Sequence, residues 1–221
     1  MDKLFALSEI NLLKALSNED LKEMDELTQI TLYPKNTFIQ TPDTFVEKLF
    51  YVKKGKVRLY QLNAEGKMFT LDLLSEGNVF GELNQVSLGT RNLYIEAIEE
   101  SHICTIDQIR FEAFMLEHPR LMMNMIGLLS KRVGQMSLLA QHLALENLSE
   151  RIIQALIKLA HQFGHMREGA YMKIDLPISH QELAGLVGAS REAVTMALQE
   201  LAHNNMIKTG FRTIYIHHSK L

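Results

Sequence analysis

The stretch "GASREAVTMALQEL", residues 188–201, places charged side chains where a helix begins. A glycine leads into Ser190, whose hydroxyl can accept hydrogen bonds from the unpaired N–H groups of a first helical turn. Arg191, Glu192 and Thr195 then fall near the start of an amphipathic run. In helices that read DNA, side chains at these positions meet the edges of the bases. The stretch therefore predicts a recognition helix.

The preceding residues complete the pattern of a helix-turn-helix. Ser179 and Glu182 have capping-box spacing, which predicts the start of a first helix. Ala184, Gly188 and Val194 fall where two helices approach closely, where the chain turns, and where a shared core is filled. A plain helical hairpin would explain the periodicity but not this combination.

A short hairpin is predicted after the second helix. The runs "MIKT" and "TIYIH" flank residues 210–212 as the two strands of a wing. Lys208 and Arg212 lie on this wing, where they could reach DNA phosphates. The alternative function is a sensor whose helical tail binds protein, and a protein-binding hairpin has no need of the Arg191–Glu192 pair.

The first half of the chain reads as short β-strands from about residue 31 to residue 108. Runs of apolar residues are separated by glycine turns at 54–55, 65–66 and 76–77, about every eleven residues. Within "KVRLYQL" the inward positions are predicted to be Val57 and Leu59, with Gln61 as a further candidate. This spacing indicates an antiparallel sandwich or roll. Residues 4–30 read as two short helices, with Ser17 and Asp20 starting the second.

A long helix is predicted after Pro119. One apolar seam follows a heptad spacing and consists of Met122, Ile126, Leu129, Val133, Met136, Ala140 and Leu143. A second stripe, Leu121, Met125 and Leu128, accompanies only its first half. We expect the second stripe to pack on the β domain and the seam to meet the helix of a second copy. The alternative is a buried helix within a monomer.

These elements predict an α+β protein with three segments. Residues 1–117 form an antiparallel β-roll of the cupin-like jelly-roll type. Residues 118–145 form the dimerisation helix and hinge, and residues 146–221 form a winged helix-turn-helix domain. Asn147 and Glu150 have the spacing that caps a new helix just after the second boundary.

Composition limits the function classes. The net charge of −3 gives no sign of nucleic-acid binding by itself, and residues 146–221 hold eight Lys and Arg against seven Asp and Glu. The single cysteine excludes a four-cysteine cluster within one chain and suits a reducing cytoplasm. No apolar run is long enough for a membrane span, and no signal peptide or catalytic constellation is recognised. His161 and His165 have metal-ligand spacing on a helix, but a solvated helix end is the favoured interpretation.

The whole chain resembles the Crp-Fnr family of bacterial transcription regulators. "ISHQELAGLVGASREAVTMALQEL" is similar to the family's helix-turn-helix, and "GNVFGELNQVSLGTRNLYIEA" resembles its phosphate-binding cassette. The resemblance implies a homodimer that reads a palindromic double-stranded DNA site and contacts RNA polymerase. It also implies an effector pocket between β-roll and seam, with control through residues 143–147.

The resemblance assigns roles in DNA recognition. Arg191 would take guanine with two hydrogen bonds, and Glu192 would accept from the amino group of cytosine. Met196 stands where many members carry a second arginine, so this step would be read weakly or through a thymine methyl group. The positions that usually hold phosphates are Ser179, His180, Gln181 and Ser190.

The cassette matches the cyclic-nucleotide-binding type only in part. Gly81, Glu82, Leu83 and Arg91 agree with it, whereas Asn92 replaces a serine and the intervening segment is one residue shorter. On the long helix, Met136 replaces a threonine that contacts adenine, while Ser137 is retained. Glu82 and Arg91 are equally explained as an ion pair that braces a turn.

The expected effector is therefore a small anion held by Arg91, and cyclic AMP is the alternative. Other small acids, haem, an iron–sulfur cluster or no ligand at all are known in the family. The lone cysteine argues against the iron–sulfur cluster, and nothing singles out a haem ligand.

Overall fold

The computed structural model describes residues 22–23, 26–83, 86–166, 170–210, 212–217 and 219. They form two compact units, one ending at Val133 and the other beginning at Gly134. The helix start expected at Ser17 and Asp20 lies outside the described residues. None of the helices among the described residues is long and apolar enough to cross a membrane.

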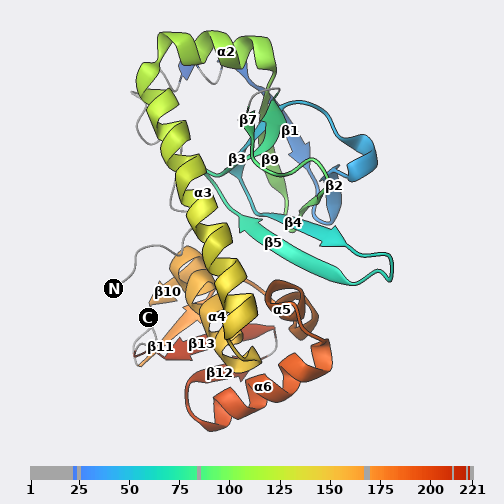
Figure 1. Cartoon of the computed structure of the whole chain (residues 1–221), viewed down its shortest axis with the longest axis vertical. Helices are drawn as coiled ribbons and strands as arrows, with labels where there is room; N and C mark the ends of the chain where they lie inside the picture. Colours follow the sequence, from blue (N-terminus) through green and yellow to red (C-terminus); the bar gives the residue numbers. More distant parts are fainter. Residues whose placement is uncertain are drawn as a thin grey trace. The chain divides into compact units, whose positions relative to one another are not determined.

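The first unit is built on two antiparallel sheets (Figure 1). One has the strand order β1-β9-β3-β6-β7 and the other the order β2-β8-β4-β5. The strands are β1 (Gln29–Tyr33), β2 (Thr37–Gln40), β3 (Leu49–Lys54), β4 (Val57–Leu62), β5 (Met68–Leu74), β6 (Val79–Leu83), β7 (Val86–Ser87), β8 (Tyr94–Ala97) and β9 (Ser101–Ile106), and a single 3-10 turn, η4 (Pro42–Thr44), follows β2. The predicted β-roll is confirmed, beginning slightly earlier than expected.

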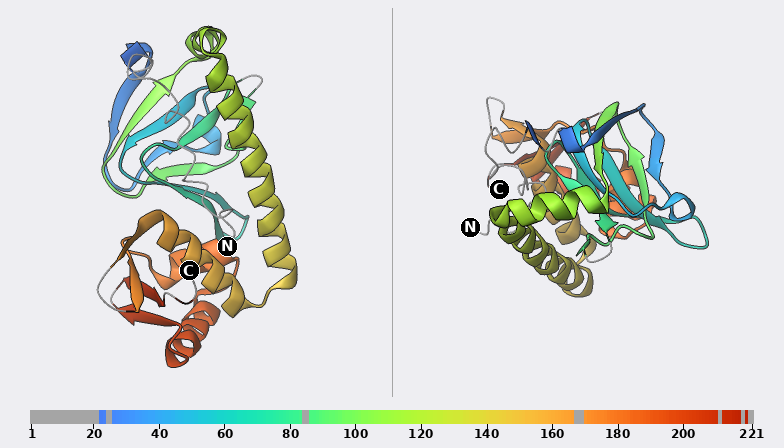
Figure 2. Two further views of the ribbon diagram at one scale, coloured as in Figure 1. Left: turned by 90° about the vertical axis from the view of Figure 1, so that its left-hand side faces the viewer. Right: turned by 90° about the horizontal axis from the view of Figure 1, so that it is seen from above.

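The strands of the two sheets enclose the interior of the roll (Figure 2), and apolar residues of both sheets fill it. Val57 and Leu59 of β4 meet Phe50 of β3 and Phe80 of β6, whose rings stack with centroids 4.9 Å apart. The predicted alternation ends after Leu59, because Tyr60 is buried as well and Gln61 is exposed, so the inward placement considered for Gln61 is wrong. The ring of Tyr94 on β8 stacks on Tyr60 with centroids 5.4 Å apart and covers it.

The cassette glycine that precedes Glu82 cannot be replaced without a clash. Gly81 has φ +107°, and a Cβ there would overlap the carbonyl oxygen of Lys48. We predict that Gly81→Ala lowers the free energy of unfolding by at least about 2 kcal/mol. The strand must move away from Lys48, and the alanine must in addition adopt a strained positive φ. Urea denaturation at fixed protein concentration measures this.

Gly89→Ala is the matched control, since Gly89 has φ +71° but open space around its Cβ position. It should cost only the backbone strain of about 1–2 kcal/mol. Equal losses for the two variants would refute the close approach at Gly81.

Two helices follow the roll. α2 (Gln108–Glu117) begins at Asp107, whose carboxylate accepts from the backbone N–H of Arg110, 3.0 Å away. α3 (Pro119–Leu145) is the predicted long helix. The second stripe on α3 is buried, with Leu121 0%, Met125 3% and Leu128 8% exposed, and it packs with Phe111 and Phe114 of α2. The expected packing of this stripe on the β domain is confirmed.

The second unit contains the helix-turn-helix and a small sheet (Figure 1). Its strand order is β10-β11-β13-β12, so the predicted wing is one edge of a four-stranded sheet. Asn147 and Glu150 cap α4 reciprocally, as predicted. The elements are α4 (Leu148–Phe163), β10 (Gly164–Met166), β11 (Tyr171–Ile174), α5 (His180–Val187), α6 (Arg191–His203), β12 (Ile207–Gly210) and β13 (Thr213–His217).

Candidate nucleic-acid interface and effector cassette

The turn between α5 and α6 has the geometry that its residue types predict. Gly188 ends α5 in the left-handed conformation, with φ 68°. Ala184 and Val194 are fully buried between the helices, at 1% and 0% exposure. The Ser190 hydroxyl accepts from the N–H of Ala193 at 3.2 Å and starts α6. This turn therefore fixes the direction in which the first residues of α6 project.

The first turns of α6 present polar groups to solvent. Arg191 and Glu192 are exposed, and Met196 one turn further on is 71% exposed. An exposed methionine on a helix offers an adaptable apolar contact. These three side chains are free to meet a partner, as base-reading residues must be.

A hollow of about 520 Å³ lies beside this turn, between α5, α6 and the wing. It is lined by Ile178, Ser179, His180, Gln181, Arg191, Thr209, Gly210, Arg212, Thr213 and Ile214. Three of the four expected phosphate-contacting residues before α6, together with Arg212, thus line one hollow. The start of α5 also lies there, and the positive end of a helix dipole favours an anion.

Thr195 is engaged within the protein. Its hydroxyl donates to the carbonyl oxygen of Arg191 at 2.9 Å, and the Nδ1 atom of His180 lies 2.8 Å from the hydroxyl oxygen of Thr195. The hydroxyl therefore has partners other than a base, in contrast to Arg191 and Glu192.

The two wing cations also have partners inside the unit. The Lys208 ammonium lies over the ring of Tyr171, 4.2 Å from its centroid. Arg212 has φ 50° and approaches the Glu182 carboxylate at 3.8 Å. That carboxylate also accepts from the N–H and hydroxyl of Ser179, which forms the predicted capping box. Arg212 is therefore held in the lining of the hollow, whereas Lys208 lies over Tyr171 of β11 and is not part of that lining.

Glu82 braces the cassette of the β-roll. This glutamate is 7% exposed, and its Oε1 atom accepts from the backbone N–H groups of Thr90 and Arg91 at 2.7 and 2.6 Å. Gly81, Glu82 and Leu83 end the buried strand β6. The glutamate thus ties β6 to the turn before β8, which supports a folding role for this residue.

Arg91 is half exposed and already meets two carboxylates. Its guanidinium lies 3.0 Å from Glu47 and 3.4 Å from Glu82, and it stacks over the ring of Phe45 at 4.6 Å. Asn92 beside it is exposed. An incoming anion would have to compete with Glu47 for this arginine.

The seam residues of α3 remain largely uncovered in the single chain. Ile126, Val133 and Met136 are 56%, 67% and 64% exposed, and Leu129 alone packs partly against the β-roll core. Ser137 is exposed too. Met136 and Ser137 belong to the second unit and the cassette to the first.

One cation of the first unit, Arg132, was not predicted to be a site residue. Arg132 on α3 is partly buried, and burial lowers the pKa of its guanidinium, while the buried carboxylate of Asp72 on β5 opposes that shift. The signal was present, because Arg132 follows Leu121, Met125 and Leu128 at the same four-three-four spacing. The next position of the second stripe is therefore occupied by a charged residue instead of an apolar one.

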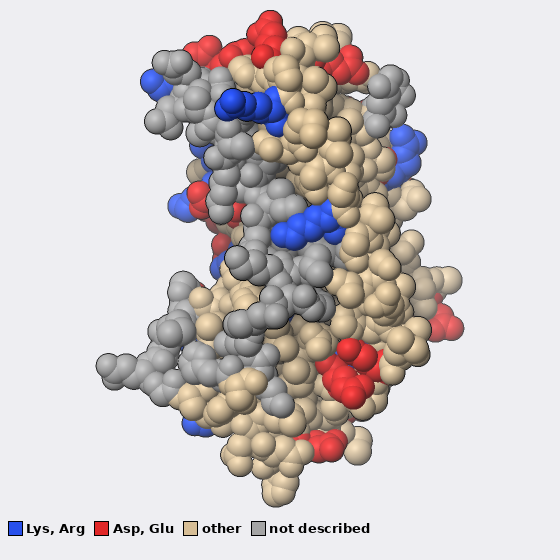
Figure 3. Space-filling view, turned by 60° about the vertical axis from the view of Figure 1, so that its left-hand side comes forward, with Lys and Arg blue, Asp and Glu red and all other residues tan. Residues whose placement is uncertain are grey.

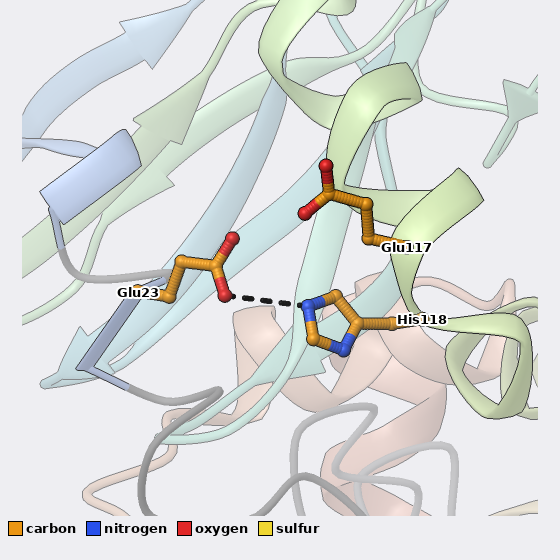
Figure 4. Close-up of side chains that lie close together, drawn as sticks. All are labelled: Glu23, Glu117 and His118. Atoms are coloured by element: carbon orange, nitrogen blue, oxygen red, sulfur yellow. Dashed lines mark ion pairs between the residues drawn. The ribbon is translucent and has the colours of Figure 1, made fainter.

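A cluster of His118, Glu23 and Glu117 lies at the junction of α2 and α3 (Figure 4). The Nε2 atom of His118 lies 3.4 Å from Glu23, and both glutamates are exposed. Exposed carboxylates commonly lie this close without an ion, so we regard the cluster as an ion pair. The expected helical pair of His161 and His165 is wrong, because α4 ends at Phe163 and His165 lies in β10.

The surface carries mixed charge. The face drawn in Figure 3 shows Lys and Arg groups and Asp and Glu groups as small separate clusters in a larger uncharged area. This agrees with the modest net charge of −3.

Two family matches cover most of the chain. Residues 30–118 match the cyclic nucleotide-binding domain, and residues 150–220 match the Crp-like helix-turn-helix domain. The chain belongs to the Crp-Fnr family of transcription regulators. Members of this family are DNA-binding regulators with an effector-binding domain, and they are not enzymes.

Similar members differ in what their names say they sense. The chain is 30% identical to the cyclic AMP receptor protein of Thermus thermophilus, over 87% of this chain and 86% of that one. It is 29% identical to the global nitrogen regulator of Synechocystis, over 85% and 84% of the two chains. The structure of a CooA mutant from Carboxydothermus hydrogenoformans superposes with a TM-score of 0.79 at 25% identity, covering 95% of this chain and 92% of that one.

Proposed function

We propose that this Crp-Fnr protein is a cytoplasmic homodimer that binds a palindromic DNA site and is gated by a small anionic effector. The observation that carries the DNA-reading part is the exposed Arg191–Glu192 pair at the capped start of α6, above a buried helix-turn-helix core. RNA polymerase is the proposed protein partner. The segments proposed are the β-roll (1–117), the dimerisation helix (118–145) and the winged domain (146–221).

The roles proposed at the DNA divide into two kinds. Arg191 and Glu192 read bases, with Met196 placed for a thymine methyl group. Backbone contacts, which position a protein without specifying sequence, come from Ser179, His180, Gln181, Ser190, Lys208 and Arg212. Four members of this second set, Ser179, His180, Gln181 and Arg212, line one hollow beside α5 and the wing, which supports their assignment.

The dimer proposal rests on the uncovered seam. Apolar side chains at heptad spacing on one helix are typical of a coiled-coil partner. Val133 and Met136 are each more than 60% exposed in the single chain, whereas the second stripe is buried. A second copy of α3 would remove these side chains from water. The burial of apolar surface would stabilise the dimer by about 25 cal/mol per Å².

An anionic effector is supported by two cations of the first unit. Arg91 lies at the surface of the cassette, and Arg132 is partly buried near the carboxylate of Asp72. Guanidinium groups suit both carboxylates and phosphates. The likeness to a cyclic AMP receptor keeps cyclic AMP as the second candidate. Against it stand Asn92 and Met136, which alter two contacts that the nucleotide uses in the family.

Calorimetry on nucleotide-free protein tests the effector. We expect a small organic acid to bind and cyclic AMP to bind at least about a hundredfold more weakly, because two lost polar contacts cost about 1–3 kcal/mol each. The anion should no longer bind Arg91→Ala and should bind Glu47→Gln more tightly, since Glu47 competes for the guanidinium. Micromolar cyclic AMP binding that also tightens DNA binding would contradict this expectation.

Selection from a randomised duplex library tests the proposed function itself. The full-length protein should enrich a two-fold symmetric site, because two identical recognition helices read two half-sites. Enrichment of an asymmetric site would argue against the dimer. No enrichment, together with capture of a protein by the helical tail, would favour the sensor alternative.

A further inference from the structure

His180 is the one titratable side chain among the described residues that line the hollow beside α5, apart from two arginines. It begins α5, and its ring is fixed by Thr195 of α6. The contact between His180 and a DNA phosphate rests on the proposed function.

The two hydrogen bonds of the Thr195 hydroxyl favour one tautomer of His180. A hydroxyl has one proton, and the carbonyl oxygen of Arg191, 2.9 Å from Thr195 Oγ1, can only accept. When the Thr195 proton is used there, as is common for a helical threonine, Nδ1 of His180, 2.8 Å from Thr195 Oγ1, has to donate. Only this tautomer forms both bonds at once. In the neutral ring, Nε2 then carries a lone pair.

A lone pair cannot bond a phosphate oxygen, because both groups are acceptors. Protonation adds an N–H at Nε2 and a positive charge, which turns repulsion into a charge-assisted hydrogen bond. We propose that Thr195 is a positioning residue that makes the phosphate contact of His180 conditional on protonation. DNA binding then takes up one proton at each half-site, and affinity rises as the pH falls through the range from about 8 to 5 in which histidines become charged.

The charged groups around the ring agree with this role. Arg191 faces the hollow from α6, and Arg212 faces it from the connection between β12 and β13. On α5 itself Glu182 is occupied by Ser179 and approached by Arg212. The strands β12 and β13 contribute Thr209, Gly210, Thr213 and Ile214, which do not titrate. A bound DNA phosphate would therefore add a negative charge next to His180, and a nearby negative charge favours the imidazolium form.

The test measures affinity for the selected duplex from pH 5.5 to pH 8.5 at constant ionic strength. Wild type should gain about tenfold per half-site on acidification, the usual worth of one charge-assisted hydrogen bond. His180→Arg should bind at every pH with at least the low-pH affinity of wild type, since guanidinium stays charged. The difference between the two profiles removes contributions from other groups.

Two substitutions at position 195 separate positioning from structure. Thr195→Val keeps the shape but frees Nδ1, so the neutral ring can present its proton at Nε2. Its affinity at pH 8.5 should rise to within about threefold of its value at pH 5.5. Thr195→Ser keeps the hydroxyl and should keep the wild-type profile. Long-range ¹H–¹⁵N spectra of the free wild-type protein should show the neutral ring protonated at Nδ1, whatever the variants do.

Identical pH profiles for wild type and His180→Arg, or a neutral ring protonated at Nε2, would overturn this inference while leaving DNA binding intact. Failure of the wild type to bind any duplex would instead overturn the proposed function and, with it, the phosphate contact. The two failures are therefore distinguishable.

Discussion

Val133→Asp is expected to convert the protein from a dimer to a monomer and to abolish tight DNA binding. Val133 is 67% exposed in the single chain and lies in the middle of the seam, so the fold of each chain should survive the substitution. In a dimer the two carboxylates would face one another in an apolar interface without partners. Burial of unpaired charge costs several kcal/mol, which raises the dissociation constant by more than about a hundredfold. Sedimentation equilibrium measures it.

Asn124→Asp is the control for this prediction. Asn124 lies on the same helix, outside the seam spacing, and the change adds an equal charge at nearly constant volume. It should leave the dimer and its DNA affinity unchanged. A Val133→Asp protein that remains fully dimeric with normal DNA binding would refute the seam, and equal dissociation of both variants would point to a general charge effect.

The second large effect is expected at the recognition helix. Arg191→Ala and Glu192→Ala should each lose about 1–3 kcal/mol of discrimination at one base pair per half-site, because each removes a hydrogen bond to a base edge. Since α6 carries both at its exposed start, the protein should stay folded and dimeric. Selections on randomised half-sites, repeated with each variant, measure the lost preference.

Two kinds of control sharpen that result. Glu200→Ala removes an exposed acid from the far end of α6 and should change no base preference. Lys208→Ala and Arg212→Ala should weaken binding to all sequences alike and reduce the salt dependence, as loss of a phosphate contact does. An unchanged site preference after Glu192→Ala would contradict the assignment of α6 as the reading helix.

The helix-turn-helix was predictable because its signals are local. Ser179 with Glu182, and Ser190 with the turn at Gly188, act on backbone groups within four residues, so the sequence carries the whole geometry. The roll was predictable from its glycine turns, of which Gly55, Gly66 and Gly77 all have positive φ. The long helix was predictable because its two apolar stripes keep one period over many residues.

Features that depend on distant contacts were not predictable. α2 and the β10–β11 hairpin are short, and packing on α3 and pairing with β13 stabilise them more than any local pattern does. The burial of Tyr60 depends on Tyr94 of β8, whose ring stacks on it. Likewise the hydrogen bond between Thr195 and His180 joins residues fifteen positions apart on two different helices.

The affinity of the full-length protein for its selected palindrome, measured against a scrambled duplex over a range of salt concentrations, tests the central claim most directly. We predict binding at least about a thousandfold tighter to the palindrome at physiological salt. The affinities for both duplexes should fall steeply as salt rises, because lysine and arginine contacts release counterions. Equal affinity for the two duplexes, or binding insensitive to salt, would contradict a regulator that reads DNA through α6.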